Sequence, residues 1–330
     1  MKKHNVHTIL ILWVALLIAA TAFAACAAKE KETPPPVGDG DESVDTVALF
    51  MPQLQDAAMQ NLQAAIGGYA TSAGIELSVF DAEGKSKKQV SQIKSVLADG
   101  VDAILLCPAS PEELGDGVDA AGEAGIPVVV LRENIVGAED TAAFVGPDFT
   151  DGGNRTMARA MSDLPDGGGI AEVFGAKGHP ATDAISAGYA EALKGATDRY
   201  PIAAEGTGDW SAEKTLELVN EWFAAGKEPA AIVCNNDGMA TGALEAVLST
   251  GRAGRINIYG LGGQRNILDA IRAGTAKATA IIDVDAEAKT AVELAVKLIA
   301  GEDVKRNHLI PMTLITAENV DSYLPQGGSS

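Results

Sequence analysis

The side chains of this sequence that could bind a ligand stand directly after short apolar runs. Arg132 and Glu133 follow the apolar run 128–131, and Asn236 closely follows the run 230–234. A carboxylate can accept from two hydroxyl groups, an arginine donates several hydrogen bonds in a fixed fork, and an amide both donates and accepts. These residue types favour reversible binding of a small polar molecule. For Arg132 and Glu133, a salt bridge within the loop or between lobes is the alternative.

Residue patterns needed for catalysis or for metal binding are missing from this sequence. Of its four histidines, His4 and His7 belong to a segment that we expect to be removed, which leaves His179 and His308, too few for a usual zinc site. The sequence contains no nucleophile elbow, no phosphate-binding loop and no Cys-x-x-Cys pair. We therefore expect a protein that is not an enzyme and that needs no cofactor and no metal ion.

The N-terminal segment predicts export. Lys2 and Lys3 precede an apolar run of 17 residues, 9–25, which is short for a membrane span and ends in small residues, as a secretory signal does. Residues 23–26 resemble the site at which bacterial lipoproteins are cleaved and lipidated, although Phe23 stands where Leu or Val is usual. We expect a signal peptide over 1–25 and a lipid on Cys26; ordinary cleavage, with Cys26 incidental, is the alternative.

Composition and charge bound the rest of the chain. Residues 26–44 are polar and rich in proline and glycine, which predicts a flexible tether. The net charge of −20 argues against nucleic-acid binding, because that function needs a basic face. No other stretch is long and apolar enough to span a bilayer. We expect the protein to contact the membrane through its lipid anchor only. Its expected location is the outer face of the cytoplasmic membrane or the periplasm.

From residue 45 onward, one unit repeats: a short apolar run, a turn and an amphipathic stretch with helical spacing. Near-continuous apolar runs predict strands of parallel sheets covered by helices on both faces. Two series of about five such units predict an α/β protein with two doubly wound parallel sheets rather than one eight-fold barrel. The strands are predicted at 46–51, 75–80, 101–106, 126–131, 142–146, 169–174, 201–206, 230–234, 256–261 and 278–282, with a further helix over 286–300.

The sequence resembles the type I periplasmic solute-binding proteins that are similar to ribose-binding protein. The matching segments are 100–108, 125–130, 230–243 and 298–302, in the same order along about 270 residues. The resemblance implies two lobes that close around a ligand like a Venus flytrap, joined by three crossings near 146–148, 282–284 and 310–312. It implies an N-terminal lobe of 45–146 plus 283–311 and a C-terminal lobe of 147–282 plus 312–330.

The resemblance also implies which residues face the ligand. Asp56 takes a position that is usually Asn, and Met59 takes one that is usually aromatic; capping of the following helix is an equal alternative for Asp56. Arg132 and Glu133 stand where the family commonly has Asp-Arg. Asp183 stands at a position that is often Arg, and a first-turn carboxylate favoured by the helix dipole is its alternative.

Three further candidates follow from the same resemblance. Trp210 matches an aromatic residue that could cover one face of a ligand, or it could pack onto the core. Asn236 is the most secure match, and Asp237 beside it is expected to cap the next helix. Gln264 is a candidate because Gly262 stands where sugar binders commonly have a carboxylate.

Asp283 is the last candidate, next to a crossing position where Ile282 replaces the usual Gln. Together with Asp56, Glu133 and Asp183 it makes the expected cleft more acidic than a typical sugar site. Carboxylates favour a hydroxyl-rich ligand or a cation, because unpaired buried charge is costly.

These features predict the substrate-binding component of an ABC importer, most simply for a monosaccharide or polyol. The expected partners are the small ligand and a membrane permease, with the protein itself a monomer. A receptor for a cationic or nucleoside-like solute, or a sensor domain for a membrane signalling protein, are the alternatives. Cys107 and Cys234 each close an apolar run and are expected to be free, with a disulfide left open.

Overall fold

The computed structural model describes residues 44–137 and 142–324. The predicted signal peptide, the lipidation site Cys26 and nearly all of the predicted tether lie outside these residues, as do residues 325–330 of the predicted C-terminal lobe. Within the described ranges, no helix is long and apolar enough to cross a membrane.

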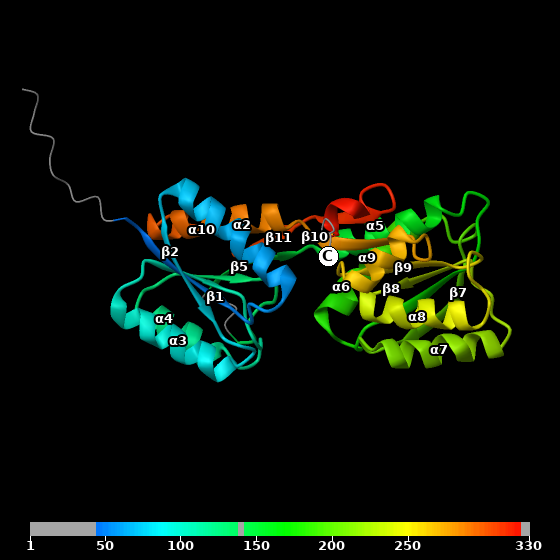
Figure 1. Ribbon diagram of the computed structural model, residues 1–330, viewed down its shortest axis with the longest axis horizontal. Coiled ribbons are helices and arrows are strands. Elements are labelled where there is room, and N and C mark those ends of the chain that lie inside the picture. The colour runs from blue at the N-terminus through cyan, green and yellow to red at the C-terminus, as the bar shows by residue number, and fades with distance from the viewer. Residues whose placement is uncertain (1–43, 138–141, 325–330) are drawn as a thin grey trace, which may run out of the picture. The chain divides into compact units, whose positions relative to one another are not determined.

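The first sheet has six strands in the order β11-β5-β4-β3-β1-β2, and all its neighbouring strands are parallel. Helices α2 (Ala57–Ala73) and α10 (Val284–Ile299) cover one face, and α3 (Ser86–Asp99) and α4 (Gly115–Glu123) cover the other (Figure 1). The strands are β1 (Thr46–Met51), β2 (Glu76–Asp81), β3 (Ala103–Leu106), β4 (Val128–Leu131), β5 (Ala142–Pro147) and β11 (Asn307–Ile310).

The second sheet also has six strands, in the order β12-β10-β9-β8-β6-β7, and only the pair β10–β12 is antiparallel. Helices α7 (Ala212–Ala224), α8 (Asp237–Ser249) and α9 (Arg265–Arg272) cover one face, and α5 (Phe149–Ser162) and α6 (Pro180–Leu193) the other. A short 3₁₀ helix, η1 (Val320–Tyr323), packs beside α9. The strands are β6 (Ile170–Phe174), β7 (Ile202–Thr207), β8 (Ala231–Cys234), β9 (Asn257–Leu261), β10 (Ala278–Ile282) and β12 (Met312–Thr316).

Apolar residues on both faces of each strand explain this layering. In β1, Val47 and Leu49 pack under α2 and α10, while Ala48 and Phe50 pack under α3 and α4, and all four are buried. A strand of this kind needs a helical cover on each side, which parallel crossovers provide. The predicted α/β class with two doubly wound sheets is confirmed, and two open sheets exclude the single barrel.

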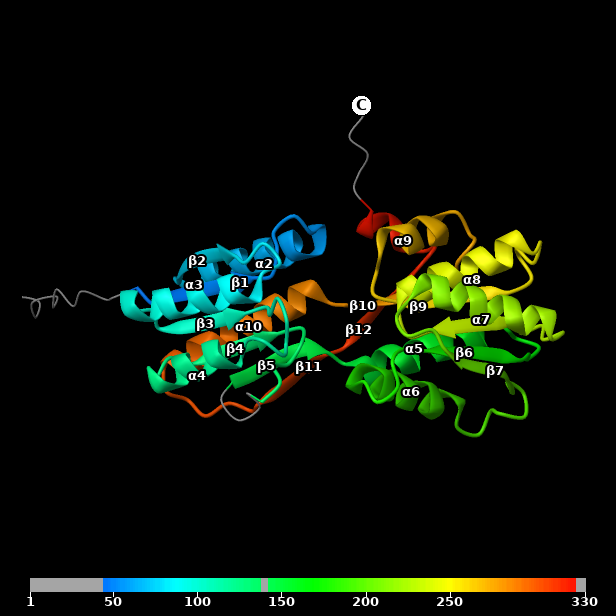
Figure 2. The same ribbon diagram turned by 90° about the horizontal axis from the view of Figure 1, so that it is seen from below.

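Three connections pass from one sheet to the other: β5 to α5, β10 to α10, and β11 to β12 (Figure 2). Two of them are tied together, because the Asp148 N–H donates to the Ile310 carbonyl at 2.9 Å. Asp148 also caps α5 by accepting from the Asp151 N–H. The exact lobe boundaries, and closure of the lobes, stay predictions.

The prediction of ten strands was incomplete. β11 and β12 were expected only as a crossing, because they are four and five residues long and carry polar residues such as Asn307 and Thr313. Cys107, just after β3, and Cys234, at the end of β8, are both buried and free, so no disulfide joins them.

Candidate functional site

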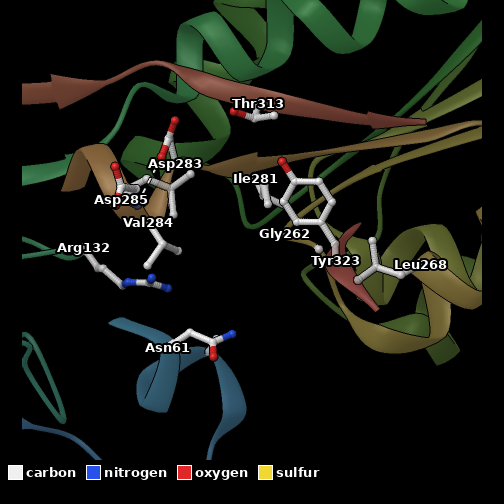
Figure 3. A pocket seen from close by; sticks show the side chains of 13 residues that line it. Asn61, Arg132, Gly262, Leu268, Ile281, Asp283, Val284, Asp285, Thr313 and Tyr323 are labelled. Carbon is white, nitrogen blue, oxygen red and sulfur yellow. Dashed lines mark hydrogen bonds between the residues drawn. The ribbon is translucent and has the colours of Figure 1, made fainter. Parts of the chain in front are cut away.

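A pocket of about 400 Å³ lies where the first turns of α2 and α10 meet the loop after β9 and the end of β10. Its apolar side includes Leu268, Ile281 and Val284, while Gly262 and Gly263 add backbone (Figure 3). Its polar side chains are Asn61, Arg132, Asp283, Asp285, Thr313 and Tyr323. A concave, partly apolar site of this size with a few convergent polar groups is the usual form of a small-molecule site.

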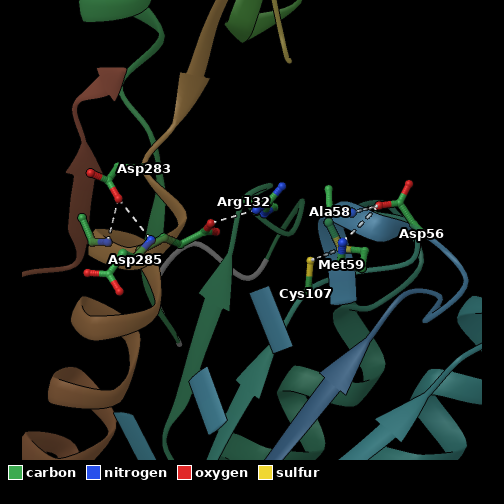
Figure 4. Close-up of polar contacts among 9 residues, drawn as sticks. Asp56, Ala58, Met59, Cys107, Arg132, Asp283 and Asp285 are labelled. Atoms are coloured by element: carbon green, nitrogen blue, oxygen red, sulfur yellow. Dashed lines mark hydrogen bonds and ion pairs between the residues drawn. The ribbon is translucent and has the colours of Figure 1, made fainter. Parts of the chain in front are cut away.

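Arg132 enters the pocket from the end of β4. Its backbone has a φ of 67°, in the left-handed region, and its N–H donates to the Val145 carbonyl at 2.8 Å. Its guanidinium Nη2 lies 3.1 Å from Oε2 of Glu287 in α10 (Figure 4). Arg132 therefore lines the pocket, and its guanidinium forms an ion pair with Glu287, which is not part of the lining.

Glu287 is fully buried, which raises the pKa of its carboxyl to about 7, although Arg132 opposes that rise. Burial disfavours the charged form of a carboxyl group, and a neighbouring cation favours it. The sequence analysis did not single out Glu287. Its position in the first turn of α10 carries no sequence signal that separates it from a surface glutamate, and only the packed structure shows that its side chain is buried.

Two carboxylates stand at the start of α10. Asp283 caps the helix, accepting from the N–H groups of Asp285 and Ala286 at 3.1 Å each. Asp285 accepts from the Tyr69 hydroxyl of α2 at 2.8 Å, and this hydrogen bond raises the pKa of Tyr69. Both carboxylates line the pocket, which makes this rim acidic.

The predicted contacts in the first lobe are only partly gathered here. Asp56 is exposed and caps α2, with Oδ1 accepting from the N–H groups of Ala58 and Met59 at 2.8 and 3.0 Å. Met59 packs against the core, with its sulfur 3.9 Å from that of Cys107. Neither lines the pocket, although Ala58 between them does. Glu133 is exposed and outside the pocket lining as well.

The helix cap that was expected at Asp237 is provided by Asn236. Asn236 caps α8, accepting from the Met239 N–H at 2.8 Å. Asp237 was wrongly expected to be the cap. It is fully buried and accepts from the Gln264 N–H at 2.6 Å and from the Thr279 hydroxyl at 2.7 Å. Burial raises its pKa to about 6, with these hydrogen bonds opposing the rise.

The backbone N–H of Gln264, and not its side chain, makes this contact with Asp237. The hydrogen bond fixes the turn formed by the two glycines before it. Gly262 and Gly263 both have positive φ, 134° and 73°, so the loop after β9 adopts a conformation that side chains rarely tolerate. Both glycines line the pocket, whereas Gln264 itself is exposed and not in the lining.

Trp210 and Asp183 lie at the same edge of the second sheet, outside the pocket lining. Trp210 is half-buried, packs against the core and has a positive φ of 61°. Its ring makes an edge contact with His179, with ring centres 5.2 Å apart. Asp183 is exposed in the first turn of α6.

Of the nine predicted ligand residues, the pocket brings together Arg132 and Asp283. Sequence reasoning missed Asn61, Asp285, Thr313 and Tyr323. Asn61 and Asp285 each follow a helix cap residue, Asp56 and Asp283, by a few positions. A helix that begins at the sheet edge presents its first residues to the ligand site at that edge, so this spacing was a usable sequence signal. Across the described ranges, no group of three or more His, Cys, Asp or Glu residues is arranged to hold a metal ion.

Comparison with known proteins identifies the family. A family model described as a periplasmic binding protein domain matches residues 47–303. The chain is 30% identical to a xylitol-binding protein of Mycolicibacterium smegmatis, with 77% of this chain and 72% of that protein covered. It is 26% identical to the ribose import binding protein of Bacillus subtilis, with 92% and 97% covered.

The fold agrees with these matches. A crystal structure of an ABC transporter solute-binding protein from Bacillus halodurans with bound myo-inositol superposes with a TM-score of 0.66 at 29% identity. The alignment covers 86% of this chain and 98% of that one. Proteins of this family bind solutes and do not catalyse reactions. The chain therefore belongs to the family of periplasmic binding proteins.

Proposed function

We propose that this protein is the solute-binding component of an ABC importer and that it captures an uncharged polyol or monosaccharide in the pocket described above. The observation that carries the proposal is the pocket itself, in which polar and apolar side chains from the helices and strands of both sheets converge on about 400 Å³. Because residues of both lobes line one site, a ligand binds more tightly to the lobe arrangement in which both sets of residues contact it. A permease could then recognise that arrangement.

The chemistry of the lining suits a hydroxyl-rich ligand. Asp283 and Asp285 can accept from hydroxyl groups, Arg132 can donate to them, and the amide of Asn61 can do both. Leu268, Ile281 and the other apolar residues can cover the C–H groups of the ligand. Such a division into polar contacts for orientation and apolar contacts for burial is general for small-molecule sites.

The relatives support the same class of ligand. Their names and bound ligands include xylitol, ribose, myo-inositol and, in a structure with 26% identity from Mycobacterium smegmatis, glycerol. These molecules carry several hydroxyl groups and no charge. One observation favours a second candidate, a ligand with an amino group: Asp283 and Asp285 place two carboxylates at one rim of the pocket.

A thermal-shift screen tests the proposal. At a hundredfold excess over its Kd, a true ligand stabilises a protein by about 2.7 kcal/mol, which corresponds to a rise in Tm of about 4–5 °C for a chain of this size. We expect such a rise with at least one of xylitol, ribose, myo-inositol and glycerol, and Arg132→Met should weaken its binding by about tenfold or more.

The outcome also separates the two candidates. Stabilisation by amino sugars alone would favour the cationic ligand, and no response to any neutral polyol or sugar would refute the proposal. Asp198→Asn, an exposed change in a turn after α6, is the matched control and should leave binding unchanged.

We further infer that the protein is exported, acts as a monomer and is held at the membrane by a lipid on Cys26, ahead of a tether. In cells of a suitable bacterium, the full-length protein should partition into the detergent phase of a two-phase extraction, and Cys26→Ser should move it to the aqueous phase. Wild-type protein found in the aqueous phase would contradict the anchor and leave the binding function untouched.

A further inference from the structure

The ion pair between Arg132 and Glu287 joins a pocket residue to a residue that the pocket does not reach. The side chain of Arg132 is 21% exposed and lines the pocket, whereas Glu287 is 0% exposed and is not part of the lining. Glu287 belongs to α10, and Arg132 follows the end of β4 (Figure 4). The cation thus faces the ligand site with its counter-charge behind it.

The backbone of Arg132 is held in an uncommon conformation at the same place. A φ of 67° is rare for a residue other than glycine, asparagine or aspartate, because the side chain is sterically strained there. Such conformations persist where the surroundings determine them, and here the N–H bond to Val145 fixes the turn. The direction of the Arg132 side chain is therefore fixed at both ends, by the backbone hydrogen bond to Val145 and by the ion pair of the guanidinium with Glu287.

The buried atoms of this pair keep unused hydrogen-bonding capacity. Among the described residues, Nε and Nη2 of Arg132 and both carboxylate oxygens of Glu287 are buried without a hydrogen bond of good geometry, although the charges lie 3.1 Å apart. A buried ion pair is favourable only when its remaining donors and acceptors are satisfied. The buried Nε and Nη2 are on the side of the ion pair, so a ligand hydroxyl meets Arg132 through the part of the side chain that is exposed to the pocket.

We propose that Glu287 is a specificity-determining residue, which positions Arg132 and cancels its charge so that the pocket selects uncharged polyhydroxylated ligands over sugar acids. The inference rests on the proposed function and extends it to a residue that does not touch the ligand. Without Glu287, the guanidinium would be an unpaired cation and would attract a carboxylate. Asp283 and Asp285 at the rim act in the same direction, because they repel anions.

The test is a change of selectivity in Glu287→Gln, which keeps the shape of the side chain and removes its charge. Calorimetric titration at pH 8, where Glu287 is ionised, compares each neutral probe with an anionic counterpart. The probe pairs are xylitol with D-xylonate, ribose with D-ribonate and myo-inositol with D-glucuronate. The wild-type protein should prefer the neutral member, and the variant should reduce that preference by about tenfold or more.

Two further variants distinguish an effect of the Glu287 charge on selectivity from a general effect on folding. Glu172→Gln makes the same change at a glutamate that is 7% exposed, in β6 and outside the pocket lining, and should leave the preference unchanged. The double variant Arg132→Met with Glu287→Met removes both charges and keeps an apolar contact. It should bind the neutral probes more weakly and still reject the acids.

The results separate the two proposals. If Glu287→Gln keeps the wild-type preference while the wild-type protein binds a neutral probe, the role of Glu287 is refuted and the proposed function stands. If Glu287→Gln does not fold, a double variant that binds sugar acids as well as the neutral probes refutes that role. If the wild-type protein binds none of the neutral probes, the proposed function fails, and the inference fails with it.

Discussion

At the scale of single residues, capping and ligand binding are compatible roles. Asp283 caps α10 with one carboxylate oxygen and also lines the pocket. A carboxylate has two oxygens, so one can accept from the helix N–H groups while the other remains available to a ligand. Helix capping and ligand contact, stated from sequence as alternatives, are therefore not exclusive.

Asp237 illustrates a residue whose contribution is to stability. It links the start of α8 to β10 and to the turn before α9, through Thr279 and Gln264. We expect Asp237→Ala to lower the free energy of unfolding by about 2–4 kcal/mol, because it leaves a buried hydroxyl and a backbone N–H without an acceptor. Urea denaturation measures this change.

Asp237→Asn is the conservative comparison for that experiment, since it keeps one oxygen acceptor and should cost less than the alanine variant. Asp198→Ala, at an exposed turn, should change the midpoint little. Equal stability of Asp237→Ala and the wild-type protein would contradict the role given to this network.

At the scale of elements, the apolar runs were sufficient to predict ten strands, and their order along the chain predicted two sheets. Starts were placed too early where a run begins in a turn: the strand predicted over 101–106 begins at Ala103. β11 and β12 could not be predicted in this way, because their exposed positions carry polar residues such as Asn307 and they continue straight from one sheet to the other.

The candidate site was less predictable than the fold for a physical reason. Parallel strands bring their carboxyl ends to one edge, so sequence order placed Arg132, Trp210 and Asn236 at sheet edges. Which edge residues share one pocket depends on how α10, β12 and η1 return to that edge, and this requires long-range packing. Thr313 and Tyr323 belong to those returning segments and carried no local signal.

At the scale of the whole molecule, three buried acids make the stability depend on pH. Burial raises the pKa of Glu172 to about 7, with a smaller effect from Glu205 beside it in β7, and raises those of Glu287 and Asp237 to about 7 and about 6. Their ordinary values are 4.5 for glutamate and 3.8 for aspartate. In each case, folding favours the protonated form.

The sign follows from that difference. A group whose pKa is higher in the folded state contributes stability that is fully present below its unfolded pKa and is lost as the pH rises through its folded pKa. Acids with lowered pKa values, such as Glu83 and Glu228, act in the opposite direction, but below pH 4.5. We therefore expect the free energy of unfolding to fall as the pH rises from 5 to 8.

Glu172→Gln should remove part of that fall, because the amide has no charge to desolvate. Relative to the wild-type protein, the variant should gain about 1–3 kcal/mol at pH 8 and little at pH 4.5. Urea midpoints at four pH values between 4.5 and 8 measure the difference, with Glu302→Gln, an exposed glutamate after α10, as the control that keeps the wild-type slope. Parallel curves for Glu172→Gln and the wild-type protein would mean that Glu172 titrates as an exposed acid, and that the edge of the second sheet admits water to its side chain.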